Sequence, residues 1–170
     1  MGVDGEPVKD FGRLVYQASV VDDLFETKTR DWAAESGGAY KHARLKSSER
    51  ALEKTFRAYG NDPSRLLDLS RRSILFRTLE EMHRCVELLR DDPDVACVRI
   101  KNRLDLGYDS AESAGYRDIA VNLRLATTRA QTLGVEGHVV ELQLMLHDFA
   151  TLKSDGGHAR YKEFRNERGD

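Results

Sequence analysis

The sequence predicts an α/β domain in which four or five strands form a mixed sheet flanked by helices. Three observations favour this fold. Helical and strand-like segments alternate along the chain without internal repeats. The 170 residues, 40% of them hydrophobic, are enough for one domain with a sizeable core. The strand-like segments of the second half carry charged and aromatic residues where a buried sheet would be apolar, so we expect the sheet to carry a functional site.

Capping and turn residues mark the ends of the expected helices. Apolar residues recur at three- and four-residue spacings up to Gly37-Gly38, Ser47 caps a second helix and Thr78 caps a third. The expected helices cover residues 10–34, 47–59 and 78–89, and one or two more follow the last strand and are separated at Gly156-Gly157. The chain is therefore expected to form a single domain, residues 1–170, in which an N-terminal helical segment (1–40) precedes the core (41–170).

Alternating side chains define the faces of the expected strands. The strands cover residues 67–76, 95–103, 116–125 and 138–145. In the third strand, Val121 faces one way and Asn122 the other, in a run with one apolar and one polar face. In the fourth strand, Glu141 and Gln143 share a face.

Composition excludes several classes of protein. The formal net charge of −2 argues against a protein that is held to nucleic acid mainly by bulk electrostatics. No glycine-rich phosphate loop of either common type appears, so any nucleotide must be held by side chains. Cys85 and Cys97 have no metal-ligand spacing and lie among apolar residues, which predicts two buried free thiols. Without a signal peptide or an apolar run long enough to span a membrane, the chain is expected to be cytoplasmic, or delivered into a target cytosol.

Two carboxylates are candidates for a metal site. Asp68 lies at the start of one expected strand, and Glu141 lies in the middle of another. If these strands are neighbours, the two carboxylates could bind one Mg²⁺. The alternative is structural, with Asp68 capping a turn and Glu141 paired with Arg124.

A cluster of cations surrounds the start of the second helix. Its members are Arg44, Lys46, Arg50 and Lys54. Arg50 and Lys54 are one helical turn apart and share a face, and the helix N-terminus adds positive potential that favours phosphate. A solvated basic face is the alternative interpretation.

These motifs together resemble the synthetase domain of the RelA/SpoT family over most of the chain. They are the Arg44-Leu-Lys46-Ser-Ser-Glu-Arg50-Ala-Leu-Glu-Lys54 run, Asp68, Lys101-Asn-Arg103, Gly115-Tyr-Arg-Asp118 and Glu141-Leu-Gln143, in the family's order and spacing. The resemblance implies a nucleotidyltransferase-like fold and the transfer of the β,γ-pyrophosphate of ATP to the 3′-hydroxyl of an acceptor, usually GDP or GTP, which gives the alarmone (p)ppGpp. The wording of the motifs is similar to short RelA/SpoT-like domains attached to toxins.

The resemblance also implies a role for each matching residue. Asp68 and Glu141 correspond to the catalytic carboxylates that bind Mg²⁺, and Glu141 is also a candidate base for the 3′-hydroxyl. The expected ATP-phosphate residues are Arg44, Lys46, Arg50, Lys54 and Arg72. The expected acceptor residues are Lys101, Arg103, Tyr116, Asn122, Gln143, His147 and His158, although packing or capping of a helix is an equal alternative for His158.

One segment departs from the family pattern and bears on the acceptor. Residues 104–114 contain no lysine or arginine but include Asp105, Asp109 and Glu112, where housekeeping members carry a lysine that contacts the acceptor phosphate. An acidic loop should repel a GDP or GTP phosphate tail. We therefore expect ATP as donor and a different acceptor, such as an adenine nucleotide or a tRNA 3′ end. An inactive nucleotide-binding regulatory module and a protein-interaction domain remain as alternatives, and the oligomeric state is left open.

Overall fold

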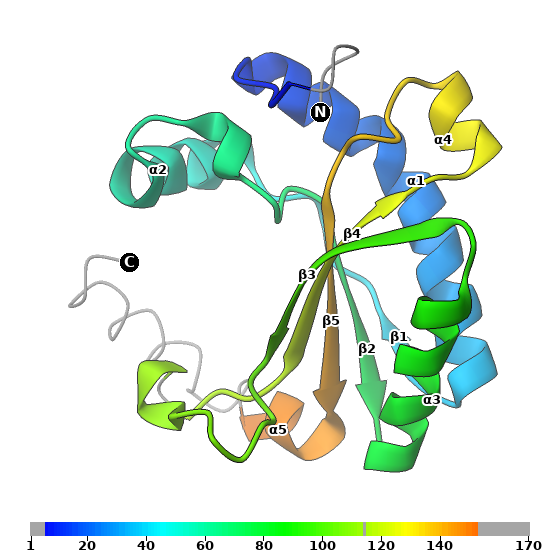
Figure 1. Cartoon of the computed structure of the whole chain (residues 1–170). Coiled ribbons are helices and arrows are strands. Elements are labelled where there is room, and N and C mark those ends of the chain that lie inside the picture. The colour runs from blue at the N-terminus through cyan, green and yellow to red at the C-terminus, as the bar shows by residue number, and fades with distance from the viewer. Residues whose placement is uncertain (1–5, 114, 153–170) are drawn as a thin grey trace.

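Five strands form one mixed sheet in the order β1-β2-β5-β4-β3 (Figure 1). The computed structural model describes residues 6–113 and 115–152. The strands are β1 (Ala39–Lys41), β2 (Arg71–Phe76), β3 (Val95–Asn102), β4 (Ile119–Leu125) and β5 (Val140–Leu146). β2 and β5 are parallel and the other neighbours are antiparallel, which confirms the mixed sheet. The sequence did not predict β1, whose first two residues fall in the expected helical segment.

Three helices begin within one residue of the starts expected at residues 10, 47 and 78, whereas the short helix after Thr127 was not predicted. The helices are α1 (Phe11–Ser36), α2 (Ser48–Tyr59), α3 (Leu79–Asp91), α4 (Thr128–Thr132) and α5 (His147–Leu152), with short 3₁₀ turns η1 (Pro63–Arg65) and η2 (Ser110–Ser113). Ser47 accepts a hydrogen bond from the backbone of Arg50, and Thr78 forms a reciprocal capping box with Glu81. Gly37 ends α1 in the left-handed conformation, at φ 84°. The expected break at Gly156-Gly157 lies outside the described residues.

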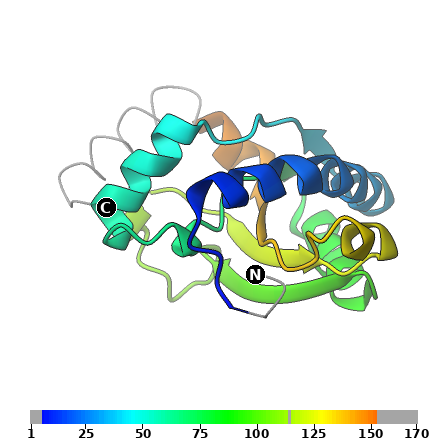
Figure 2. The same cartoon turned by 90° about the horizontal axis from the view of Figure 1, so that it is seen from above.

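Helices α1 and α3 cover one face of the sheet with an apolar core. Side chains of the even-numbered β2 and β5 residues, such as Ile74 and Leu142, pack there against Phe25 and Met82 of the helices. Fully burying each such side chain contributes about 1.5–3 kcal/mol. In both Figure 1 and Figure 2, α2 lies on the other side of the strands from α3. The second face of the sheet, on the side of α2, is thus not covered by α1 or α3 and can carry polar groups.

The edge strand β3 corrects one expectation. Cys85 is buried in the core as expected, but Cys97 is exposed. Cys97 lies on β3, which pairs with β4 and with no other strand of residues 6–113 and 115–152, and the register shifts between Cys97 and Arg99. An edge strand with an irregularity leaves side chains uncovered that alternation alone would bury. Across the described residues, no helix is both long and apolar enough to cross a membrane.

Candidate active site

Polar side chains from four neighbouring strands line the face of the sheet opposite α1 and α3. Glu141 of β5 is in register with Arg71 of β2 and with Asn122 of β4, and residues in register project from the same face. The same register brings Ser73, Gln143, Ala120, Arg99 and Lys101 to this face. The parallel β2–β5 pair therefore brings the segment after Asp68 beside Glu141, as the expected two-carboxylate site requires.

Asp68 binds two lysines of the cation cluster. The Nζ of Lys46 donates to Asp68 Oδ2 at 2.6 Å and the Nζ of Lys54 donates to the same oxygen at 3.1 Å. The chain fixes this meeting, because the Lys46 amide donates to the Leu69 carbonyl at 2.9 Å and Lys54 lies on the second turn of α2. Asp68 is an ion-pair partner, which differs from the turn cap that was its structural alternative.

Burial and charge set the protonation of this group. Burial alone would raise the pKa of Asp68, but Lys54 and Lys46 outweigh it and hold the pKa below its usual value. Burial lowers the pKa of Lys46, while Asp68 opposes that effect. Burial also acts against the charge of Lys54, but Asp68 and Tyr59 raise its pKa. Asp68 is thus an ionised carboxylate at neutral pH.

Glu141 is the second carboxylate of the site, and its environment differs. Burial raises the pKa of Glu141, Asp68 raises it further, and Arg71 and Lys54 oppose the shift. Its Oε1 accepts a hydrogen bond of 3.2 Å from Gln143 Nε2. No ion pair joins it to Arg124 in the part of the chain that the structure describes. A carboxylate with a raised pKa beside an ionised one is the arrangement that separates a proton acceptor from a charge-binding group.

The donor set fits a divalent cation. The Oδ1 atom of Asp68 is buried and has no hydrogen-bond partner among residues 6–113 and 115–152. A buried carboxylate oxygen without a partner is costly unless something binds it. Asp68 and Glu141 offer the oxygen ligands that Mg²⁺ prefers, with water and substrate phosphates completing the shell. Within the described residues, no group of three or more His, Cys, Asp or Glu side chains is arranged to hold a metal ion, so protein ligands beyond these two carboxylates are not offered there.

Arg71 joins the site, and Arg72 does not. Arg71 is exposed on the polar face, where its charge acts on the pKa values of both Glu141 and Lys46. Arg72, which was expected to bind ATP phosphates, lies on the opposite face with 1% of its side chain exposed. Because successive strand residues face opposite ways, the buried neighbours Ile74 and Phe76 already indicated that Arg72 points into the core.

The expected acceptor residues form a second cluster beside the first. Tyr116 donates its hydroxyl to Asp118 Oδ2 at 2.9 Å, and it also contacts the Sδ of Met145 at 3.1 Å. Arg103 pairs with the fully buried Asp118 and lies over the Tyr116 ring at 5.9 Å. Burial, with Asp118, raises the pKa of Tyr116, so the hydroxyl is a donor at neutral pH. The ring of Tyr116 and the charge of Arg103 are thus held together at this edge of the site.

The remaining expected residues are distributed more widely. Asn122 is buried on the polar face, and its Nδ2 has no partner among the described atoms. Lys101 lies over the Tyr108 ring at 5.8 Å. Arg44, Arg50 and His147 are exposed, and His147 is at the start of α5. His158 lies outside the described residues.

Solved structures of alarmone synthetases share this fold. The Type VI effector Tas1, in complex with its immunity protein, is 23% identical with a TM-score of 0.59, and the match covers 80% of this chain and 61% of the effector chain. The small alarmone synthetase 1 from Bacillus subtilis, bound to its product pppGpp, is 16% identical with a TM-score of 0.67, covering 91% and 81% of the two chains. A GTP pyrophosphokinase family protein from Streptococcus pneumoniae is 14% identical with a TM-score of 0.71, covering 95% and 79%.

These similarities confirm the fold that the RelA/SpoT resemblance implied. No protein-family model matches the chain, and no curated protein sequence does. The identities of 14–23% show a common fold and leave the reaction to be argued from the site. The chain has the fold of the small alarmone synthetases.

Proposed function

We propose that this domain is a Mg²⁺-dependent pyrophosphokinase that transfers the β,γ-pyrophosphate of ATP to the 3′-hydroxyl of a nucleotide acceptor. The observation that carries the proposal is the meeting of Asp68 and Glu141 with Lys46, Lys54 and Arg71 at the polar face of the sheet. Phosphoryl-transfer catalysis depends mainly on placing positive charge around the phosphates and on orienting the nucleophile.

The residues of the site divide the chemistry between them. In the proposed reaction the acceptor 3′-oxygen bonds to the β-phosphorus of ATP, the bond from that phosphorus to the bridging α–β oxygen breaks, and AMP leaves. Lys46, Lys54 and Arg71 would stabilise the negative charge of the phosphates. Glu141, whose pKa burial raises, would accept the proton of the 3′-hydroxyl. Mg²⁺ held by Asp68 and Glu141 would neutralise phosphate charge when bound.

The comparisons support nucleotide binding in general. Among the structures that share the fold, one Bacillus subtilis synthetase is bound to pppGpp and another crystal of it is bound to AMPCPP. The likeness to the Type VI effector supports a toxin, delivered into a target cell, as the biological context. This chain spans 61% of the effector chain, so any activity of the whole effector is assigned to this protein only as part of the proposal.

The acceptor is proposed to differ from GDP and GTP. Asp105, Asp109 and Glu112 are exposed on the segment that precedes Tyr116. The guanidinium of Arg117 donates to the carbonyls of residues 103, 105 and 108, and Lys101 lies over the Tyr108 ring of this segment at 5.8 Å. The loop thus presents carboxylates, which disfavour a polyphosphate tail. An adenine nucleotide or an RNA 3′ end, such as that of tRNA, is the proposed acceptor class.

Incubation with γ-labelled ATP tests the proposal. The purified domain is given Mg²⁺ and, separately, GDP, GTP, ADP or tRNA, with Asp68→Ala as the inactive control. We expect label on ADP or tRNA with the wild type only. Label chiefly on GDP would contradict the acceptor argument, and ATP binding without transfer to any acceptor would favour the inactive regulatory module.

A further inference from the structure

A buried arginine, Arg72, connects α1 to the segments that carry the candidate site. The Nη2 of Arg72 donates to Asp22 Oδ2 at 2.5 Å and to Glu26 Oε2 at 3.4 Å, and both carboxylates come from α1. Its Nη1 donates to the carbonyls of Ala43 at 2.6 Å and Arg71 at 3.1 Å. One guanidinium therefore binds a helix, a strand and the segment before α2.

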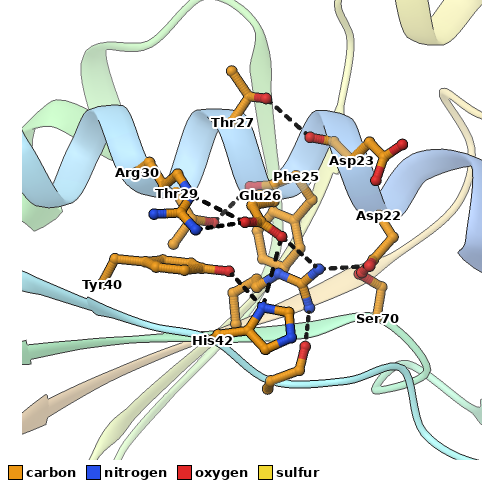
Figure 3. A network of polar contacts seen from close by, with 12 residues as sticks. Asp22, Asp23, Phe25, Glu26, Thr27, Thr29, Arg30, Tyr40, His42 and Ser70 are labelled. Carbon is orange, nitrogen blue, oxygen red and sulfur yellow. Dashed lines mark hydrogen bonds and ion pairs between the residues drawn. The ribbon is translucent and has the colours of Figure 1, made fainter.

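The carboxylate of Asp22 extends this network toward β5. Its Oδ1 accepts a hydrogen bond of 2.7 Å from the Ser70 hydroxyl, and Figure 3 shows Asp22 and Ser70 directed toward each other. The Ser70 carbonyl in turn accepts the amide of Glu141 at 3.1 Å. Asp22 thus holds both chain neighbours of Arg71, because it binds Ser70 through one oxygen and Arg72 through the other.

Each of the three segments bound by this network also carries a residue of the candidate site. The Ala43 carbonyl lies three residues before Lys46, whose amide is itself bound to the Leu69 carbonyl at 2.9 Å. Arg71 alternates with Arg72 on β2, so fixing the buried side chain fixes the backbone that directs the exposed one. The third segment is the start of β5, which contains Glu141.

Stability alone gives a weak reason for such a group in a core. Replacing a buried ion pair with apolar residues of similar volume is often neutral or stabilising. A planar guanidinium with fixed donors, in contrast, sets the relative positions of several acceptors, which a lysine cannot do. Catalytic constellations need such rigid support behind them.

We infer that Asp22 and Arg72 are positioning residues, which hold Lys46, Arg71 and Glu141 in the arrangement that binds the donor phosphates. The expected changes in KM and kcat rest on the proposed function, whereas the expected change in amide exchange does not depend on any activity. The hydrogen bonds of the network lead to the segments of Lys46, Arg71 and Glu141, and the charge of Arg71 also acts on the pKa of Tyr116, so acceptor binding is expected to change less than donor binding.

The test compares Arg72→Lys with Lys28→Met. The lysine keeps the buried charge but loses the bond to the Ala43 carbonyl or to Asp22. Lys28 is a matched control, because it pairs α1 with Asp92 at 3.0 Å at the far end of α3. A displacement of about 1 Å in a site costs ~10²-fold in rate. We expect Arg72→Lys to raise KM for ATP roughly tenfold or more and to lower kcat, with a smaller rise in KM for the acceptor.

Amide hydrogen exchange gives the second readout without any substrate. In Arg72→Lys the amides of Lys46 and Glu141 should exchange at least about tenfold faster, and in Lys28→Met they should exchange as in the wild type. Uniformly faster exchange in both variants, or an equal change in both KM values, would show a purely structural ion pair and overturn the inference. If the wild type transfers no pyrophosphate, the proposed function fails, whereas the exchange result still decides the positioning role. Asp22→Asn repeats the test should Arg72→Lys fail to fold.

Discussion

The Lys46–Asp68–Lys54 group should stabilise the protein before any ligand binds. Asp68→Asn keeps the shape of the side chain but removes the charge that two ammonium groups share at 2.6 and 3.1 Å. The exposed fractions of the side chains are 12% for Asp68, 20% for Lys46 and 22% for Lys54, so solvent screens the pairs only in part. The variant leaves two neighbouring cations without their common counter-ion.

The cost follows from the two bonds. Hydrogen bonds to charged groups contribute about 1.5–3 kcal/mol each. Asparagine still accepts one neutral hydrogen bond, and the lysines, each about a fifth exposed, can turn toward water. We therefore expect a net loss of about 2–3 kcal/mol. For a chain of this size that loss lowers Tm by roughly 5–10 °C.

Urea and thermal unfolding at neutral pH measure this loss. Asp91→Asn is the control, because Asp91 is an exposed carboxylate paired with an exposed arginine, and its removal should leave Tm unchanged. Both variants should unfold with the wild-type urea dependence. An Asp68→Asn protein as stable as the wild type would refute the reasoning, since the lysines would then be held by something other than this carboxylate.

Three further predictions concern single side chains. Burial raises the pKa of Glu141, so this group stabilises the fold while it is protonated, and the contribution is lost as the pH rises through the folded pKa. Glu141→Gln should therefore be at least as stable as the wild type at pH 7, yet transfer pyrophosphate ~10²-fold more slowly. Arg71→Ala should weaken ATP binding in calorimetry by about tenfold, with Arg90→Ala on α3 as a near-neutral comparison, and equal effects would remove Arg71 from the donor site. Burial lowers the pKa of His138 to about 4, so stability present above pH 6.5 should fall by about 3 kcal/mol toward pH 4, and His138→Leu should flatten that fall in urea titrations.

Most of what the sequence could predict came from the alternation of polar and apolar side chains along the strands. The polar face of β4 and the shared face of Glu141 and Gln143 follow directly from the two-residue period. The same period, applied to β2, would have assigned Arg71 to the site and Arg72 to the core, because Ile74 and Phe76 mark the buried face. That signal was present in the sequence, and the expectation that placed Arg72 among the ATP-phosphate residues did not use it.

Other features depend on tertiary contacts that no local pattern contains. β1 has three residues and α4 has five, which is too short for periodicity to register. Cys97 lies in an apolar run, yet the edge position of β3 exposes it. Lys46 and Lys54 both pair with Asp68, which follows them in the sequence by 22 and 14 residues. These pairs form only because the chain folds so that α2 and the segment before it lie next to the segment before β2.

The fate of the ATP phosphates tests the central claim most directly. Pyrophosphate transfer moves the β- and γ-phosphates together, so ³¹P spectroscopy of a reaction with Mg²⁺, ATP and the acceptor should show AMP and a 3′-diphosphorylated acceptor in equal amounts. The site predicts this outcome for the wild type and its loss in Asp68→Ala. Formation of ADP, which indicates single-phosphate transfer, or of free pyrophosphate with an adenylylated acceptor, would contradict the proposed reaction.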